Sequence, residues 1–136
     1  MMSEIKYIEM HILDHSWLSG KTNGDGMDAV ASFLQDVSWY SSHDFREWLI
    51  DPAVKNMQSN TSLLIRKNDN QIFIGDKYAT DFYSYAFLIP TEALIDLLLQ
   101  WEKVCEKRAQ GLIGAYITYD DTRFYVAPQF ASTHES

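Results

Sequence analysis

Two histidines near the start of the chain have the spacing of a metal-binding pair. His11 and His15 are four residues apart, with Asp14 between them. On a helix the two imidazoles would lie on one face and could bind a metal such as zinc. The residues around His11 alternate in polarity as a β-strand does, however, and on a strand this spacing does not bring two ligands together. We therefore expect no metal ion and no other cofactor.

Three further segments contain residues that could do chemistry, but none has the full pattern of a reactive site. The glycine-rich segment Ser19–Gly26 lacks the Gly-Lys-Ser/Thr ending of a phosphate-binding loop and both terminal acids of a calcium loop. Cys105 lies on the apolar stripe of a predicted helix, where a thiol behaves as a small buried hydrophobe. The pair Asp120 and Asp121 is typical of a turn. The sequence therefore predicts a protein that is not an enzyme.

Acidic residues interleaved with aromatic ones form two groups that suit a binding surface. Aromatic rings provide contact area and carboxylates provide charge, and together they fit a basic protein surface. The alternative is that the rings belong to the core and the acids are only solvated. The candidate partner-binding residues are Asp76, Asp81, Tyr83 and Tyr85 in the first group, and Trp39, Tyr40, Asp44 and Glu47 in the second.

The acidic balance of the chain narrows the choice of partner. Nineteen Asp and Glu against eleven Lys and Arg give a formal charge of -8. This charge repels the phosphates of nucleic acids and the surface of an anionic membrane, so we expect neither as a partner. It attracts a basic protein and speeds the encounter, although an acidic surface also serves solubility alone.

Length and cysteine content indicate one domain in a reducing compartment. The chain of 136 residues fits a single domain, expected over residues 1–136. Cys105 is the only cysteine, so no intramolecular disulfide can form, which is typical of a cytoplasmic protein. The start of the chain has no basic region followed by an apolar run, so we expect no signal peptide.

The first half of the chain predicts a strand followed by two helices. Alternation of apolar residues indicates the strand, and recurrence at three and four residues indicates the helices. Asp25 or Asp28 is expected to cap the first helix. The predicted elements are a strand over Ile5–Leu13, a loop over Ser19–Gly26, a helix around Val30–Val37, and a helix over Asp44–Met57 that Pro52 breaks or restarts.

The second half predicts three strands, one long amphipathic helix and a final hairpin. In the helix, Thr91 is expected to be the N-cap, and an apolar stripe from Leu94 to Cys105 leaves Glu102 largely off the buried face. The predicted elements are a hairpin of Ser62–Arg66 and Ile72–Ile74, a central strand over Phe82–Ile89, a helix from Thr91 to Gly111, a hairpin of Leu112–Tyr119 and Arg123–Ala127, and a flexible tail over 130–136.

The order of these elements predicts the fold class. Strands and helices are segregated along the chain, and tight turns join most of the strands. This arrangement favours the α+β class, with a mainly antiparallel β-sheet and helices packed on it in a single domain.

Four segments of the second half follow one another in a distinctive order. They are Ile74-Gly75-Asp76, Phe87-Leu88-Ile89-Pro90-Thr91-Glu92, the helix Leu94-Ile95-Asp96-Leu97-Leu98-Leu99-Gln100-Trp101-Glu102, and Ile117-Thr118-Tyr119-Asp120-Asp121. This order of strand, Ile-Pro, helix and strand resembles small bacterial immunity proteins, the antitoxins of polymorphic toxin and contact-dependent growth-inhibition systems. The resemblance implies a cytoplasmic protein that binds a cognate toxin domain, often a nuclease, and blocks its active site or substrate path.

Three functions are therefore compared below. The first is an immunity protein for a basic nuclease toxin, monomeric or weakly dimeric when free. The second is a non-catalytic adaptor or homo-oligomeric structural protein, whose interface would use the strand containing Tyr83 and Tyr85. The third is a small enzyme, which a deep pocket lined by acids or by His11 and His15 would reveal.

Overall fold

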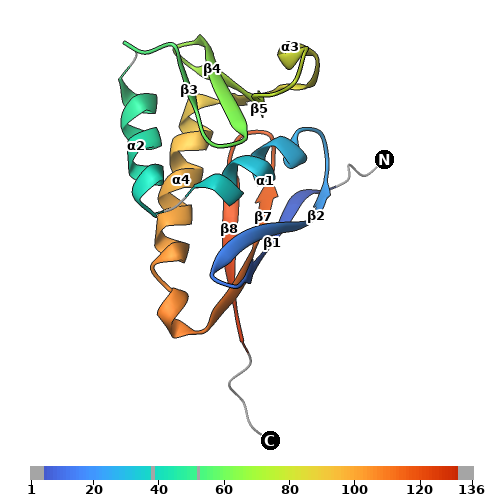
Figure 1. Cartoon of the computed structure of the whole chain (residues 1–136), viewed down its shortest axis with the longest axis vertical. Helices are drawn as coiled ribbons and strands as arrows, with labels where there is room; N and C mark the ends of the chain where they lie inside the picture. The colour runs from blue at the N-terminus through green and yellow to red at the C-terminus, as the bar shows by residue number, and fades with distance from the viewer. Residues whose placement is uncertain (1–4, 38, 52, 132–136) are drawn as a thin grey trace, which may run out of the picture.

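The fold consists of two antiparallel four-stranded sheets with helices packed between and beside them (Figure 1). The structure, a computed structural model, describes residues 5–37, 39–51 and 53–131, without the side chains of Trp39 and Tyr40. In chain order its elements are β1 (Lys6–Leu13), β2 (Ser16–Asn23), α1 (Met27–Asp36), α2 (Trp39–Ile50), β3 (Asn56–Gln58), β4 (Ser62–Asn68), β5 (Gln71–Asp76), α3 (Phe82–Tyr85), β6 (Phe87–Pro90), α4 (Thr91–Cys105), the 3-10 helix η1 (Arg108–Gln110), β7 (Leu112–Tyr119) and β8 (Phe124–Phe130).

The strand order brings the two ends of the chain into one sheet. The first sheet has the order β2-β1-β7-β8 and the second has the order β3-β4-β5-β6. Antiparallel pairing of β1 with β7 places Lys6 opposite Tyr119. The predicted α+β class with antiparallel strands is confirmed, and the strands divide between two sheets where the sequence indicated one.

One hydrophobic core connects the two sheets. In β1 the alternate residues Ile8 and Met10 are fully buried, which is the pattern of a strand with one covered face. α1 packs against both sheets, α4 packs on β8, and α2 lies beside α4 (Figure 1). At the centre, the rings of Trp17 in β2 and Trp101 in α4 lie 4.5 Å apart. The apolar stripe predicted for α4 is confirmed.

The predicted central strand over Phe82–Ile89 is wrong. Its first four residues form α3, a single helical turn, and only Phe87–Pro90 form a strand, β6, at the edge of the second sheet. The apolar character of this segment comes from rings that pack on one another: Phe82 and Tyr83 meet edge to face, with ring centroids 5.2 Å apart. Dense aromatic packing, and not burial of both strand faces, accounts for the composition.

The predicted loop and second helix also need correction. Most of Ser19–Gly26 belongs to the strand β2, which is an edge strand with only Trp17 buried and therefore lacks clear alternation. α2 covers Trp39–Ile50 instead of Asp44–Met57, and Pro52 lies outside the described residues. The tail predicted over 130–136 begins too early, because Phe130 ends β8; residues 132–136 lie outside the described part.

The predicted helix caps are wrong as well. Gly26, at φ 79°, occupies the N-cap of α1, so neither Asp25 nor Asp28 does. A Cβ at Gly26 would lie 2.0 Å from the ring of Phe87, so this position needs glycine both for its left-handed backbone and for its close contact. Thr91 is the first residue of α4, which follows Pro90, and its hydroxyl makes no capping bond.

Two buried charged side chains hold α2 against the rest of the fold. The first is Arg66 in β4, which is only 8% exposed. Its guanidinium donates to the carbonyls of Trp48 and Leu49 in the last turn of α2, and to those of Asp51 and Val54 beyond the helix. It also lies 4.5 Å from the Trp48 ring. Arg66 therefore satisfies the carbonyls that a helix leaves unpaired at its C-terminus.

The second is Glu102 of α4, which the sequence placed off the buried face. Its carboxylate accepts hydrogen bonds from Ser42 and Arg46 of α2, with Oε2 at 2.7 Å from Ser42 Oγ and 2.5 Å from Arg46 Nε. Burial acts to raise the pKa of Glu102, but these bonds and the charge of Arg46 outweigh burial and lower it below its usual value. Glu102 is thus a charged link between two helices.

One side chain of α4 also covers the outer edge of β8. The Gln100 amide donates from Nε2 to the carbonyl of Phe124 at 2.8 Å and accepts at Oε1 from the N–H of Val126 at 2.9 Å. Pro128, further along β8, has no N–H to offer. The β8 edge of the first sheet is therefore largely blocked.

Candidate functional site

Two grooves meet beside the N-terminus of α1. The larger, of about 1150 Å³, is called here the acidic groove; the smaller, of about 530 Å³, is called the tyrosine groove. Asp28 lines both. The acidic groove is lined by Ile5, Lys6, Thr22, Asn23, Gly24, Asp25, Asp28, Thr118, Tyr119, Asp120, Asp121 and Tyr125. The tyrosine groove is lined by Gly26, Asp28, Ala29, Ser32, Thr61, Ser62, Gly75, Asp76, Tyr78 and Tyr85.

The acidic groove receives carboxylates from two distant parts of the chain. Pairing of β1 with β7 places the β7–β8 turn, with Asp120 and Asp121, beside the segment that leads into α1. Asp120 accepts hydrogen bonds from the hydroxyl and N–H of Thr122 and from the N–H of Arg123. These bonds, the Thr122 hydroxyl first, hold the pKa of Asp120 far below its usual range. The shift favours the ionised form of Asp120. Beside it, Lys6 forms an ion pair with Asp121.

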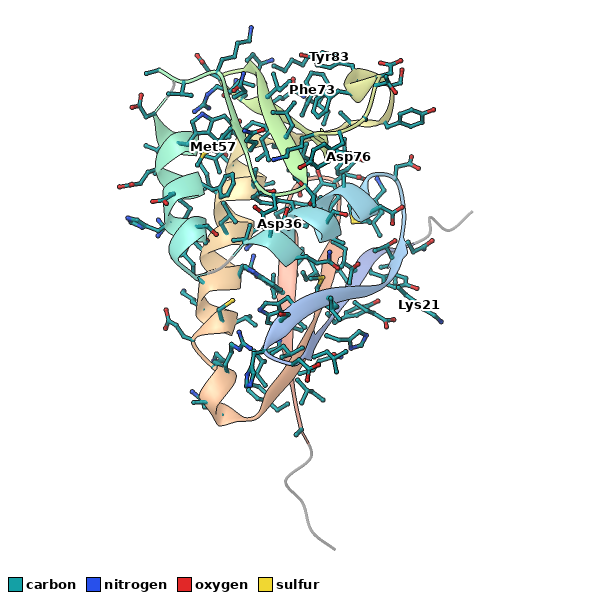
Figure 2. The ribbon with its side chains drawn as sticks, in the orientation of Figure 1. Lys21, Asp36, Met57, Phe73, Asp76 and Tyr83 are labelled. Carbon is teal, nitrogen blue, oxygen red and sulfur yellow. The ribbon has the colours of Figure 1, made fainter. Side chains whose placement is uncertain are left out.

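The tyrosine groove combines exposed rings with two carboxylates. Asp76 ends β5 on the side of the second sheet that faces α1 (Figure 2), and its Oδ1 accepts from the N–H of Tyr78 at 2.9 Å. The Tyr78 side chain is 74% exposed and Tyr85 of α3 is 81% exposed. Exposed rings of this size beside carboxylates form a surface suited to a cationic partner.

Asp36, at the end of α1, fixes one wall of the tyrosine groove. Its Oδ2 accepts hydrogen bonds from the Ser59 hydroxyl at 2.6 Å and from the N–H and hydroxyl of Thr61 at 2.9 and 2.6 Å. These bonds hold the β3–β4 turn against α1. Asp36 is thus a positioning residue for the wall that Thr61 and Ser62 provide.

Replacing Asp36 by alanine is expected to lower the free energy of unfolding by about 1–2 kcal/mol, because three donors lose their acceptor. Removing the carboxylate offsets part of this loss, because a negative charge is unfavourable at the C-terminus of a helix. Urea denaturation measures the change. Asp44→Ala, at an exposed position of α2, is the matched control and should change the value by less than about 0.5 kcal/mol. Equal effects of the two substitutions would contradict the role of Asp36.

The structure brings only part of the first predicted group into this site. Asp76 and Tyr85 line the tyrosine groove. Tyr83 instead packs edge to face against Phe73, with ring centroids 5.2 Å apart (Figure 2), and Asp81 accepts from the Ser84 hydroxyl. Because Tyr83 and Tyr85 belong to α3, the dimer strand expected for the homo-oligomeric alternative does not exist.

The second predicted group lies elsewhere. In Figure 1 α2 lies to the left of the second sheet and α3 to its right, and none of the described residues of α2 lines either groove. Asp44 and Glu47 are exposed, and Glu47 pairs with His43 at 3.5 Å. Trp39 and Tyr40 begin α2, but their side chains lie outside the described part of the structure.

Several groove residues had no signal in the sequence. In the sequence Asp28 has only the pattern of a helix cap, and Tyr78 lies in a turn without any periodic pattern. Asp120 and Asp121 were interpreted as turn residues, which they are, but their place beside Asp25 depends on the long-range pairing of β1 with β7. Local patterns do not contain that information.

The residues considered for metal binding and nucleophilic catalysis do not form a common centre in the structure. His11 is on β1 and His15 is in the β1–β2 turn at φ 68°. Within residues 5–37, 39–51 and 53–131, no three His, Cys, Asp or Glu side chains gather in a way that could hold a metal ion. Burial raises the pKa of Cys105, which disfavours the thiolate.

Comparison with known proteins does not assign the chain to a family. Protein-family models, curated proteins and solved structures were compared with the chain, and none of them matches it. Within the part of the chain that the structure describes, no helix combines the length and the apolar character needed to cross a bilayer.

Proposed function

We propose that this chain is a binding protein that uses the two joined grooves to take up a basic protein, and that this partner is the toxin domain of a polymorphic toxin system. Among the described residues, the lining of the two grooves contains five aspartates and one lysine. This concentration of carboxylates is the observation that carries the proposal, since an acidic hollow attracts and orients a cationic surface.

The type of surface also supports binding to a macromolecule. Tyr78, Tyr85 and Tyr125 present exposed rings along the two grooves, and rings of this kind often anchor protein interfaces. The acidic groove, with a volume of about 1150 Å³, is large enough to receive a projecting segment of another protein. A nuclease domain has such segments, because it binds phosphates through cationic side chains.

An immunity protein is the form of this function that the resemblance in the second half of the chain favours. Such a protein acts in the cytoplasm, needs no catalytic residue, and neutralises the toxin by covering its active site or substrate path. The segments that carry the resemblance include Asp76 and the Asp120–Asp121 turn, and both lie in the grooves.

The test mixes the purified chain with the C-terminal toxin domain encoded beside it and measures complex formation and association rate at two salt concentrations. We expect a stable complex that associates more slowly at high salt. A triple variant, Asp25→Asn, Asp28→Asn and Asp120→Asn, should reduce the association rate at low salt by about tenfold.

The control for this test removes the same number of charges away from the grooves, in Asp69→Asn, Glu92→Gln and Glu106→Gln, all at exposed positions. This control variant should change the association rate by less than about twofold, since only the carboxylates in the grooves face the partner. If both triple variants reduced the association rate equally, net charge alone would determine the rate, and the grooves would have no special role. If no complex formed at all, the proposed partner would be rejected.

A further inference from the structure

We propose that the tyrosine groove is the binding site for one arginine side chain of the basic partner. This inference rests on the proposed function and specifies which part of the surface anchors the partner and by what chemistry. It is supported by the shape of the groove, by the position of its two carboxylates and by its rings.

The groove suits a long side chain with an apolar stem. Small residues, namely Gly26 and Ala29 of the α1 region and Gly75 of β5, form part of its lining. The hollow has a volume of about 530 Å³, which exceeds the volume of one side chain and admits some of the adjoining backbone. The methylenes of an arginine can lie on such a surface while its charged end reaches polar groups.

Two carboxylates come from different elements of the lining. Asp28 belongs to α1 and Asp76 ends β5. Asp28 accepts a hydrogen bond from the Thr22 hydroxyl and Asp76 accepts one from the N–H of Tyr78, in both cases at Oδ1, so both side chains are oriented. A guanidinium, with five donors in one plane, can bond two separate carboxylates at once.

The rings favour a planar cation. The Lys77 ammonium lies 5.2 Å from the centroid of the Tyr78 ring, at the distance of a cation–π contact. Lys77 itself donates to the Ser59 carbonyl at 2.9 Å, and its single charge does not neutralise the two aspartates. Tyr85 offers a second, more exposed ring. A guanidinium stacks on aromatic faces and an ammonium does not, so arginine is favoured over lysine.

The experiment titrates the full, isotope-labelled chain with three capped peptides, Gly-Arg-Gly, Gly-Lys-Gly and Gly-citrulline-Gly, and follows backbone amide shifts by NMR. We expect saturable shifts at Gly26, Gly75 and Tyr78 with the arginine peptide. The citrulline peptide, which keeps the shape without the charge, should bind at least about tenfold more weakly. The lysine peptide should bind with intermediate affinity.

Single substitutions then test the two carboxylates. Asp28→Asn and Asp76→Asn should each weaken binding of the arginine peptide by about fivefold. Asp69→Asn, at the opposite end of the β4–β5 hairpin, removes the same charge and should leave the affinity unchanged.

Two results would overturn the inference: equal binding of the arginine and citrulline peptides, or shifts confined to the acidic groove. Neither result bears on the proposed function, which is tested separately by the toxin complex and the triple variant. Conversely, binding of the arginine peptide without any toxin complex would support the arginine site and reject the toxin as the partner.

Discussion

Replacing Arg66 by alanine is expected to lower the free energy of unfolding by about 3–5 kcal/mol, the largest effect that we predict for one side chain. Arg66 is 8% exposed and donates to carbonyls of α2 and of the segment after it. Without the guanidinium these carbonyls lose charged donors, each worth about 1.5–3 kcal/mol, and the Trp48 ring loses its contact. Chemical denaturation monitored by tryptophan fluorescence measures the loss.

Two further substitutions separate the contribution of charge from that of geometry. Arg66→Lys keeps the charge but lacks the planar fork, so it should recover only part of the stability. Arg123→Ala is the exposed control: its guanidinium pairs with Asp96 at 3.0 Å, and its side chain is 50% exposed. Such a surface pair contributes less than about 1 kcal/mol. A similar loss in Arg66→Ala and Arg123→Ala would contradict this role of Arg66.

Replacing Glu102 by alanine is expected to lower the free energy of unfolding by about 3 kcal/mol. The substitution removes the carboxylate that accepts from Arg46 and from the buried Ser42 hydroxyl, which then keeps only a longer bond to the Leu98 carbonyl, at 3.4 Å. This loss lies at the lower end of the range for removing one partner of a buried ion pair. The reason is that the Arg46 side chain is still 20% exposed, so water can partly solvate it. Glu106→Ala, one turn further along the chain at an exposed position, is the control and should cost much less.

The Glu102 carboxylate also predicts a dependence on pH. Folding lowers the pKa of Glu102, so its contribution to stability is complete at neutral pH. It decreases as the pH falls below about 4.3, the usual pKa of a glutamate, and disappears below the lowered pKa. In Glu102→Gln, which does not titrate, the melting temperature should fall less between pH 6 and pH 3 than in the unmodified chain. If the melting temperature fell by the same amount in Glu102→Gln as in the unmodified chain, Glu102 would not be the source of this pH dependence.

The sequence predicted the elements that have strong internal periodicity. The helix α4, the strand β1 and the final hairpin were recognisable because their buried residues recur at regular intervals, as Leu94, Leu97, Leu98 and Trp101 do. The strand β2 was missed because an edge strand with one buried residue has no such signal. α2 was placed incorrectly because its attachment depends on Arg66 and Glu102, which belong to other elements.

The candidate site was predicted only in part, for a related reason. Asp76 and Tyr85 were recognised as an acid and a ring close together in the chain, and both line the tyrosine groove. Asp28, which lines both grooves, and Asp120, which lines the acidic groove, come from elements far away in the sequence. A single sequence shows which residue types are present, whereas the pairing of β1 with β7 decides which of them meet.

The covered edge of β8 has a consequence for self-assembly. An open strand edge is a template on which further copies of a chain can add, and repeated addition leads to fibrous aggregates. Gln100 occupies the backbone groups of Phe124 and Val126, and Pro128 interrupts the row of donors. Addition of further copies at the β8 edge, and the growth of aggregates from it, is therefore largely blocked.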